Sequence, residues 1–99
     1  MSKVCSMLVD RIREVHGLSS DNAVSKLLGC SRQNISQWRS TPKQMDDEVA
    51  TRAAELAEID PAEILALLNA ERAKSPQTRD HWNRLAILAG SAMRSEVAA

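Results

Sequence analysis

The chain has 99 residues, of which 43% are hydrophobic and 26% charged, with no Phe or Tyr and a formal net charge of zero. This length suits one domain with a modest core, so we expect no separate sensing, catalytic or cleavage domain. Only three Gly and three Pro occur in a sequence rich in Ala, Leu, Glu, Arg, Ser and Gln. This composition favours an all-α fold over a sheet.

The sequence carries no signal for a membrane or an oxidising compartment. No stretch approaches the roughly 20 apolar residues that cross a bilayer, and charge interrupts the N-terminal segment too early for a secretory signal. Cys5 and Cys30 lie far apart and outside any C-x-x-C pattern, so we predict reduced thiols in small apolar sites. We therefore expect a cytoplasmic protein with no membrane partner.

The net charge of zero conceals an uneven distribution along the chain. Residues 1–45 carry seven Lys or Arg against three Asp or Glu, whereas residues 46–74 carry three against eight. The first part could therefore suit a polyanion, and the second would repel one. This signal is weak by itself, because charges on solvated helix faces are often distributed unevenly.

Apolar spacing predicts two helices at the start of the chain. Residues 3–16 carry an apolar stripe with helical spacing, and Gly17 is placed to end that helix. A Ser N-cap, an acid in the first turn and a short apolar face predict a second helix over about residues 21–28, with Gly29 as its stop.

The segment GCSRQNISQW, residues 29–38, joins that helix to a third through a very tight turn. Only two residues separate the helix over 21–28 from a cap at Ser31, so the two helices must cross steeply. Ile35 and Trp38 lie one turn apart and anchor the buried side of the third helix, which Thr41-Pro42 closes. The opposite side of this helix is polar.

Two further helices follow. Residues 46–58 begin with acids, which a helix N-terminus favours, and continue with an apolar face. The segment DPAEILALLNAER then supplies Asp60 as N-cap and Pro61 at the first helical position. We expect Glu63 to reach back to the N-cap as in a capping box.

The same pattern of an N-cap residue followed by proline occurs before a sixth helix. Ser75 and Pro76 precede an apolar stripe that we expect to end near Gly90, and we expect residues 91–99 to be frayed.

The window from Asp21 to Ser40 resembles the helix-turn-helix of the lambda repressor and Cro family. In that family a small residue, a turn glycine, an apolar turn residue and two apolar anchors recur at set offsets. The sequence departs from the family at Asp21, which replaces the usual Gln, and in its small residue, which is Ser where Ala is commoner. The residues at those offsets are Ser25, Gly29, Cys30, Ile35 and Trp38.

The resemblance covers about three quarters of the chain, because the helices expected before and after this window also have counterparts in the family. It implies a five-helix lambda-repressor-like DNA-binding domain in residues 1–74. Residues 75–99 would then form an additional C-terminal helix and tail, as a possible dimerisation element.

The resemblance also implies that the third helix enters the major groove of B-DNA. Arg can donate two hydrogen bonds to guanine, and Gln can pair with N6 and N7 of adenine. Phosphate contacts set the register of a protein on DNA without reading sequence. The expected base readers are Arg32, Gln33, Ser36, Gln37 and Ser40, and the expected phosphate contacts are Asn22, Ser31, Asn34, Arg39 and Lys43.

A single module of this size reads only a few base pairs, so we predict a homodimer on a near-palindromic operator. The alternative is that the last helix only packs on its own domain. The residues that we expect to form the dimer are Leu67, Leu68, Trp82, Leu85 and Leu88.

We therefore predict a transcriptional repressor of phage or prophage genes, associated with the bacterial nucleoid and regulated through occupancy, oligomer equilibrium or a separate antirepressor protein. The alternatives are an antitoxin that represses its own operon and binds a toxin, and a protein-interaction module with the same fold. No nucleotide-binding loop or activated nucleophile is found, so we expect no enzymatic activity, catalytic residue or cofactor. His16, His81 and the two cysteines lack the paired spacing of a zinc site, so we expect no metal.

Overall fold

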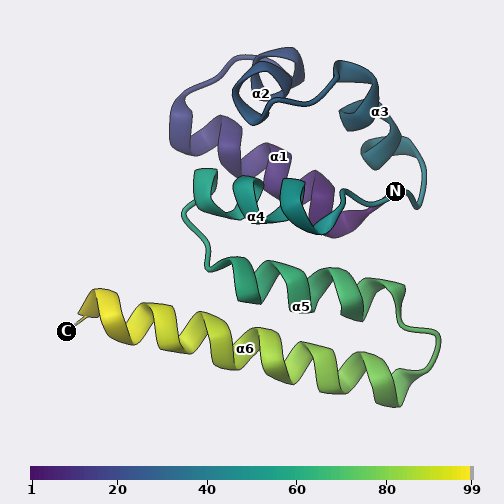
Figure 1. Ribbon diagram of the computed structural model, residues 1–99, viewed down its shortest axis with the longest axis vertical. Coiled ribbons are helices and arrows are strands. Elements are labelled where there is room, and N and C mark those ends of the chain that lie inside the picture. The colour runs from purple at the N-terminus through teal and green to yellow at the C-terminus, as the bar shows by residue number, and fades with distance from the viewer. Residues whose placement is uncertain (99) are drawn as a thin grey trace.

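The computed structural model describes the backbone of residues 1–98 and the side chains of residues 1–91. This part of the chain is helical throughout and contains no strand, which confirms the all-α prediction (Figure 1). The helices are α1 (Lys3–His16), α2 (Asp21–Leu28), α3 (Arg32–Ser40), α4 (Asp47–Leu56), α5 (Pro61–Arg72) and α6 (Pro76–Ala98).

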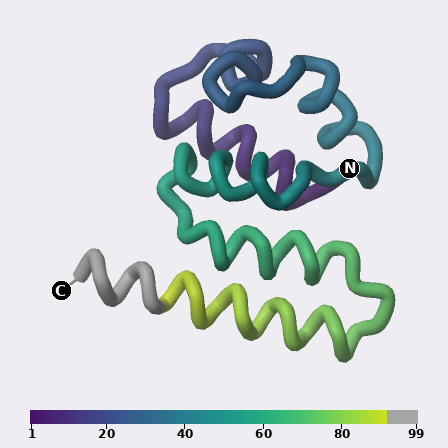
Figure 2. Tube along the Cα trace, in the orientation of Figure 1, coloured from purple at the N-terminus to yellow at the C-terminus, as the bar shows by residue number. Residues whose placement is uncertain are grey.

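The helices are arranged in successive layers. Figure 1 shows α1, α2 and α3 gathered at one end of the molecule, followed by α4, α5 and finally α6. Figure 2 shows that α6 returns antiparallel to α5 along the edge farthest from α2. Within the described chain, α6 packs closely on α5 and on no other helix.

The hydrophobic core is formed by residues of all five helices from α1 to α5, and no described residue of α6 belongs to it. Helix α1 contacts each of the four helices that follow it, so it is the central element of this core. The largest fully buried apolar side chains are Leu8, Ile12, Ile35, Ile64 and Leu68.

The predicted bounds of α1 and α2 are confirmed, because both helices have local caps. Ser2 accepts a hydrogen bond from Cys5 N, and Ser20 accepts one from Ala23 N. Both helices end at a glycine in the left-handed conformation.

Helix α4 is shorter than predicted. Asp46 lies outside the helix as its N-cap and accepts a hydrogen bond from Val49 N at 2.8 Å. At the other end, Glu58 adopts a left-handed φ of 60°, and Ile59 N then donates to Ala54 O at 2.9 Å. The chain therefore leaves the helix before residue 58.

Helix α5 has the predicted Asp60 cap but lacks the predicted capping box. Asp60 Oδ1 accepts a hydrogen bond from Ala62 N at 2.8 Å. The Glu63 carboxylate lies against Gly90 of α6 and not at the N-cap, because the close approach of the two helices places it there.

The predicted end of α6 is wrong. Thr78 N donates to the Ser75 hydroxyl at 3.2 Å, as expected at the start of the helix. The helix nevertheless passes through Gly90 and continues to Ala98, so the segment predicted to fray is helical as far as that residue. Residue 99 lies outside the described residues.

Cys5 is buried and Cys30 half-buried, and neither forms a disulfide. Burial raises the pKa of each thiol. None of the helices in the described chain combines the length and apolar character that crossing a bilayer requires.

Candidate nucleic-acid interface

The turn between α2 and α3 is short because both of its ends are capped. Gly29 adopts a left-handed φ of 77°, and the amides of Gly29 and Cys30 both donate to Ser25 O, at 2.9 and 3.0 Å. Ser31 then accepts a hydrogen bond from Asn34 N at 3.1 Å. The chain thus changes direction within two residues, and α3 starts at a fixed point.

The inner side of α3 is anchored in the core. Ile35 is 1% exposed and Trp38 2% exposed, as the one-turn spacing predicts. Ser2 N also donates to Trp38 O at 2.9 Å, so the chain that leads into α1 is bonded to the last turn of α3. These contacts hold the helix from beneath and at its C-terminal end.

Arg39 ties α3 to both preceding helices. Its guanidinium group donates to both carboxylate oxygens of Asp21, at 2.8 and 3.0 Å. It also donates to Asp10 Oδ1 at 2.7 Å and to Ser6 Oγ at 2.6 Å. We define these four residues as the Arg39 cluster.

The geometry of the Arg39 cluster does not support the expected phosphate contact. Every nitrogen of the guanidinium group is bonded within the protein, because carboxylates from α1 and α2 converge on it. The residue therefore acts in positioning α3. The bond to Arg39 also gives a structural role to Asp21, at which the sequence departs from the lambda repressor and Cro pattern.

The electrostatics of the Arg39 cluster favour the ionised forms of Asp21 and Arg39. The hydrogen bonds from Arg39 hold the pKa of Asp21 below its ordinary value, although partial burial acts the other way. The hydrogen bonds to Asp21 correspondingly raise the pKa of Arg39. Arg13 Nη1 adds a further positive charge 3.5 Å from Asp21 Oδ1.

The outer side of α3 presents the polar groups that the sequence predicts. Neither Arg32 nor Gln33 has a hydrogen-bond or ion-pair partner for its side chain among residues 1–91. The Ser40 hydroxyl donates to Ser36 O at 2.8 Å, so it is partly committed to the helix backbone. Of the expected base readers, Gln37 is half-buried, and Arg32, Gln33, Ser36 and Ser40 are exposed.

The expected phosphate contacts other than Arg39 differ in their exposure. Asn22, Ser31 and Lys43 are exposed, and Asn34 is half-buried. The Lys43 ammonium donates to Gln37 Oε1 at 2.8 Å. The spacing of Gln37 and Lys43 does not predict this contact, because the contact depends on the path of the chain after Pro42.

Helices α5 and α6 enclose an open groove of about 540 Å³, which we call the Trp82 groove. Leu85 and Leu88 are 51% and 59% exposed at this groove, and no charged side chain lines it. Three of the expected dimer residues therefore lie together. The groove is lined by Ala62, Leu65, Ala66, Asn69, Trp82, Leu85, Leu88 and Ala89.

The other two expected dimer residues lie elsewhere. Leu68 is 1% exposed and belongs to the core, so its assignment to a dimer surface is wrong. Leu67 is half-buried and lines a second groove of about 450 Å³. The faces to which the leucines of α5 belong could not be predicted from the sequence, because the helix is apolar over most of its circumference.

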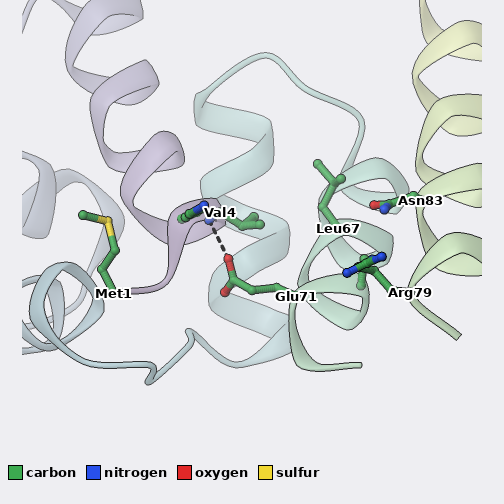
Figure 3. A pocket seen from close by; sticks show the side chains of 8 residues that line it. Met1, Val4, Leu67, Glu71, Arg79 and Asn83 are labelled. Atoms are coloured by element: carbon green, nitrogen blue, oxygen red, sulfur yellow. Dashed lines mark hydrogen bonds between the residues drawn. The ribbon is translucent and has the colours of Figure 1, made fainter. Parts of the chain in front are cut away.

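The second groove, which we call the Glu71 groove, contains charged side chains. Figure 3 shows Leu67 and Glu71 between Met1 and Val4 on one side and Arg79 and Asn83 of α6 on the other. Val4 N and the Ser2 hydroxyl donate to Glu71, at 3.0 and 2.6 Å.

Glu71 is held as an anion. Partial burial would raise the pKa of Glu71, but hydrogen bonds from Ser2, Gln44 and the backbone near Val4 outweigh it and lower that pKa. This carboxylate therefore caps the start of α1.

Comparisons with protein-family models, curated proteins and solved structures found no match. Among the described residues, no group of three or more His, Cys, Asp or Glu side chains is arranged to hold a metal ion.

Proposed function

We propose that this protein is a sequence-specific double-stranded DNA-binding repressor of transcription, with a lambda-repressor-like arrangement of α1 to α5. In this proposal α3 enters the major groove, which is wide enough to admit an α-helix. The family resemblance of residues 21–40 supports phage or prophage genes as the targets.

The observation that carries the proposal is the contrast between the two sides of α3. Ile35 and Trp38 fix the inner side in the core, and Arg39 fixes its angle to α1 and α2. The outer side offers Arg32 and Gln33 with their hydrogen-bonding groups unengaged in the described chain. A rigid helix with free donors and acceptors is suited to reading base edges, because little conformational freedom is lost on binding.

The proposal includes a homodimer formed through the Trp82 groove. The groove is lined mainly by apolar groups, and Leu85 and Leu88 are exposed on the same surface. A surface with both features can pair with a copy of itself around a two-fold axis. Two copies would then bind two half-sites, which one short module cannot specify alone.

The first test measures binding to labelled random-sequence duplexes over a range of salt concentrations, followed by selection of preferred sites. We expect affinity to fall steeply with salt, because protein cations displace counterions from the phosphates. We expect the selected sites to contain two inverted half-sites about 34 Å apart. Affinity that barely changes with salt would instead favour a protein-interaction module.

A variant pair tests the assignment of base reading. Gln33→Ala should cost about 1–3 kcal/mol at one base position. Gln77→Ala is the matched control, because Gln77 is an exposed glutamine at the start of α6. Full sequence preference in the Gln33→Ala protein would show that Gln33 does not read a base.

The second candidate is an antitoxin-type autorepressor. The Trp82 groove favours it as well, because a toxin or antirepressor could occupy this apolar surface. Copurification of a partner that competes with dimer formation would support this alternative.

A further inference from the structure

Hydrogen bonds hold the chain to the last turn of α3 directly after the helix ends. Thr41 N and the Thr41 hydroxyl both donate to Gln37 O, at 2.8 and 2.7 Å. Lys43 N then donates to Thr41 Oγ1 at 3.1 Å. These hydrogen bonds hold Lys43 close to the last turn of α3, where its ammonium donates to Gln37 Oε1 at 2.8 Å.

The chemistry of lysine determines how the Gln37 amide is turned. An ammonium group has three N–H donors and no acceptor, so it can bond only the oxygen of a side-chain amide. The Gln37 Nε2 group therefore faces away from Lys43 and retains two N–H donors. No hydrogen bond of this nitrogen is found among residues 1–91.

Gln33 provides the contrast within the same helix. Its side chain is exposed and has no partner in the described chain, so its amide can turn to present either oxygen or nitrogen. Of the two glutamines of α3, only Gln33 is therefore free to make the paired donor and acceptor contacts that adenine requires.

Resting on the proposed function, we infer that Lys43 and Gln37 act together as an all-donor pair that reads guanine. Guanine presents two acceptors in the major groove, N7 and O6, whereas adenine and cytosine each present an amino donor. Thymine presents one acceptor beside a methyl group. Lys43 is thus a specificity-determining residue, and the adenine contact suggested for glutamine applies to Gln33 and not to Gln37.

The positive charge strengthens this selection. The Gln37 oxygen has a second lone pair, but the Lys43 ammonium 2.8 Å away would repel the amino hydrogens of adenine or cytosine. The same charge attracts the acceptors of guanine. An ammonium has three donors, so Lys43 can bond Gln37 and also donate to a phosphate. The family resemblance implies this phosphate contact.

The experiment selects bound sites from random duplexes with the wild-type protein and three variants. Gln37→Ala identifies the base position that Gln37 reads. Lys43→Met removes the ammonium, and Lys43→Arg is the matched control because it keeps an all-donor charged group. A general loss of phosphate binding cancels, because only the relative preference among bases at that position is compared.

We expect guanine at the Gln37 position in the wild type. Lys43→Met should lower the preference for guanine over adenine roughly tenfold, and Lys43→Arg should retain most of it. Adenine at this position in the wild type, an unchanged preference in Lys43→Met, or no position altered by Gln37→Ala would overturn the inference while leaving the proposed function intact. Failure of the wild type to bind any duplex would refute the proposed function itself.

A measurement without DNA tests the contact directly. The side-chain amide resonances of Gln37 in the free protein should shift in Lys43→Met, whereas those of Gln33 should not. Unchanged Gln37 resonances would show that Lys43 does not hold the amide, and the inference would then be wrong.

Discussion

Arg39 shows how one side chain can determine the angle of a helix. Its guanidinium group binds Asp21 at the start of α2 and Asp10 on α1, so it joins three helices at one point. Bidentate arginine–carboxylate pairs are geometrically specific as well as strong. The side chains of Arg39 and Asp21 are 27% and 32% exposed, so solvent screens the pair only in part.

Because of this arrangement, we predict that the contribution of Asp21 to the stability of the folded protein depends on pH. The pKa of Asp21 is held below the ordinary value of 3.8 by the hydrogen bonds from Arg39. A depressed folded pKa contributes stability above the unfolded pKa, and this contribution is lost as the pH falls through the folded pKa. We predict that Asp21→Asn lowers the free energy of unfolding by about 1 kcal/mol near neutral pH and that the difference disappears in strong acid.

Urea unfolding at a series of pH values measures this difference. Glu71→Gln is the control, because the pKa of Glu71 is also lowered but its partners are Ser2, Gln44 and Val4. The acid sensitivity due to Glu71 should therefore persist in Asp21→Asn. A constant difference between Asp21→Asn and the wild type down to strong acid would show that the Arg39 cluster does not depend on an ionised Asp21.

At the scale of the helix, the features that depend on local sequence were predicted well, and the features that depend on tertiary contacts were not. The caps at Ser20 and Ser31 and the stop at Gly29 act within a few residues, so the bounds of α2 and the start of α3 follow from the sequence. The role of Arg39 depends on carboxylates brought by other helices. No local pattern could reveal it.

The prediction that α6 ends near Gly90 was wrong for the same physical reason. A glycine after an apolar stripe commonly ends a helix, yet this one lies inside α6, where a Cβ atom would stand 2.9 Å from Glu63 Oε2. Its lack of a side chain leaves room for the Glu63 carboxylate against α6. This function is visible only when both helices are in place.

A substitution pair tests the contact between Gly90 and Glu63. Gly90→Ala gains about 1 kcal/mol of helix propensity but must shift the flexible end of the Glu63 side chain, so we predict a stabilisation smaller than this gain. In a Glu63→Ala background the same substitution should stabilise the protein by about 1 kcal/mol. Urea unfolding of the four proteins measures this coupling, and equal effects in both backgrounds would contradict it.

At the scale of the whole molecule, α6 lies outside the hydrophobic core formed by α1 to α5. It packs closely only on α5 within the described chain, and it lies at the opposite end of the molecule from α2 and α3 (Figure 1). Its exposed side chains include Leu85, Ile87 and Leu88. A helix that is peripheral to the core and retains large exposed apolar residues is typical of an interaction surface.

Neighbouring residues of α6 offer a matched test of the dimer. Leu88 is 59% exposed and lines the Trp82 groove, whereas Ile87 is 65% exposed and does not line it. The two side chains point about 100° apart around the helix axis. We predict that Leu88→Glu weakens self-association at least tenfold, because it places an unpaired charge in an apolar contact, and that Ile87→Glu has little effect.

Sedimentation equilibrium measures the association, and binding to a two-half-site duplex shows its consequence for DNA recognition. Leu88→Glu should bind a single half-site as well as the wild type does, because α3 is remote from the change, but it should lose the additional affinity for two half-sites. If Ile87→Glu dissociates the dimer and Leu88→Glu does not, the copies meet through another face of α6. If neither does, α6 only covers α5, and the operator is bound without this contact.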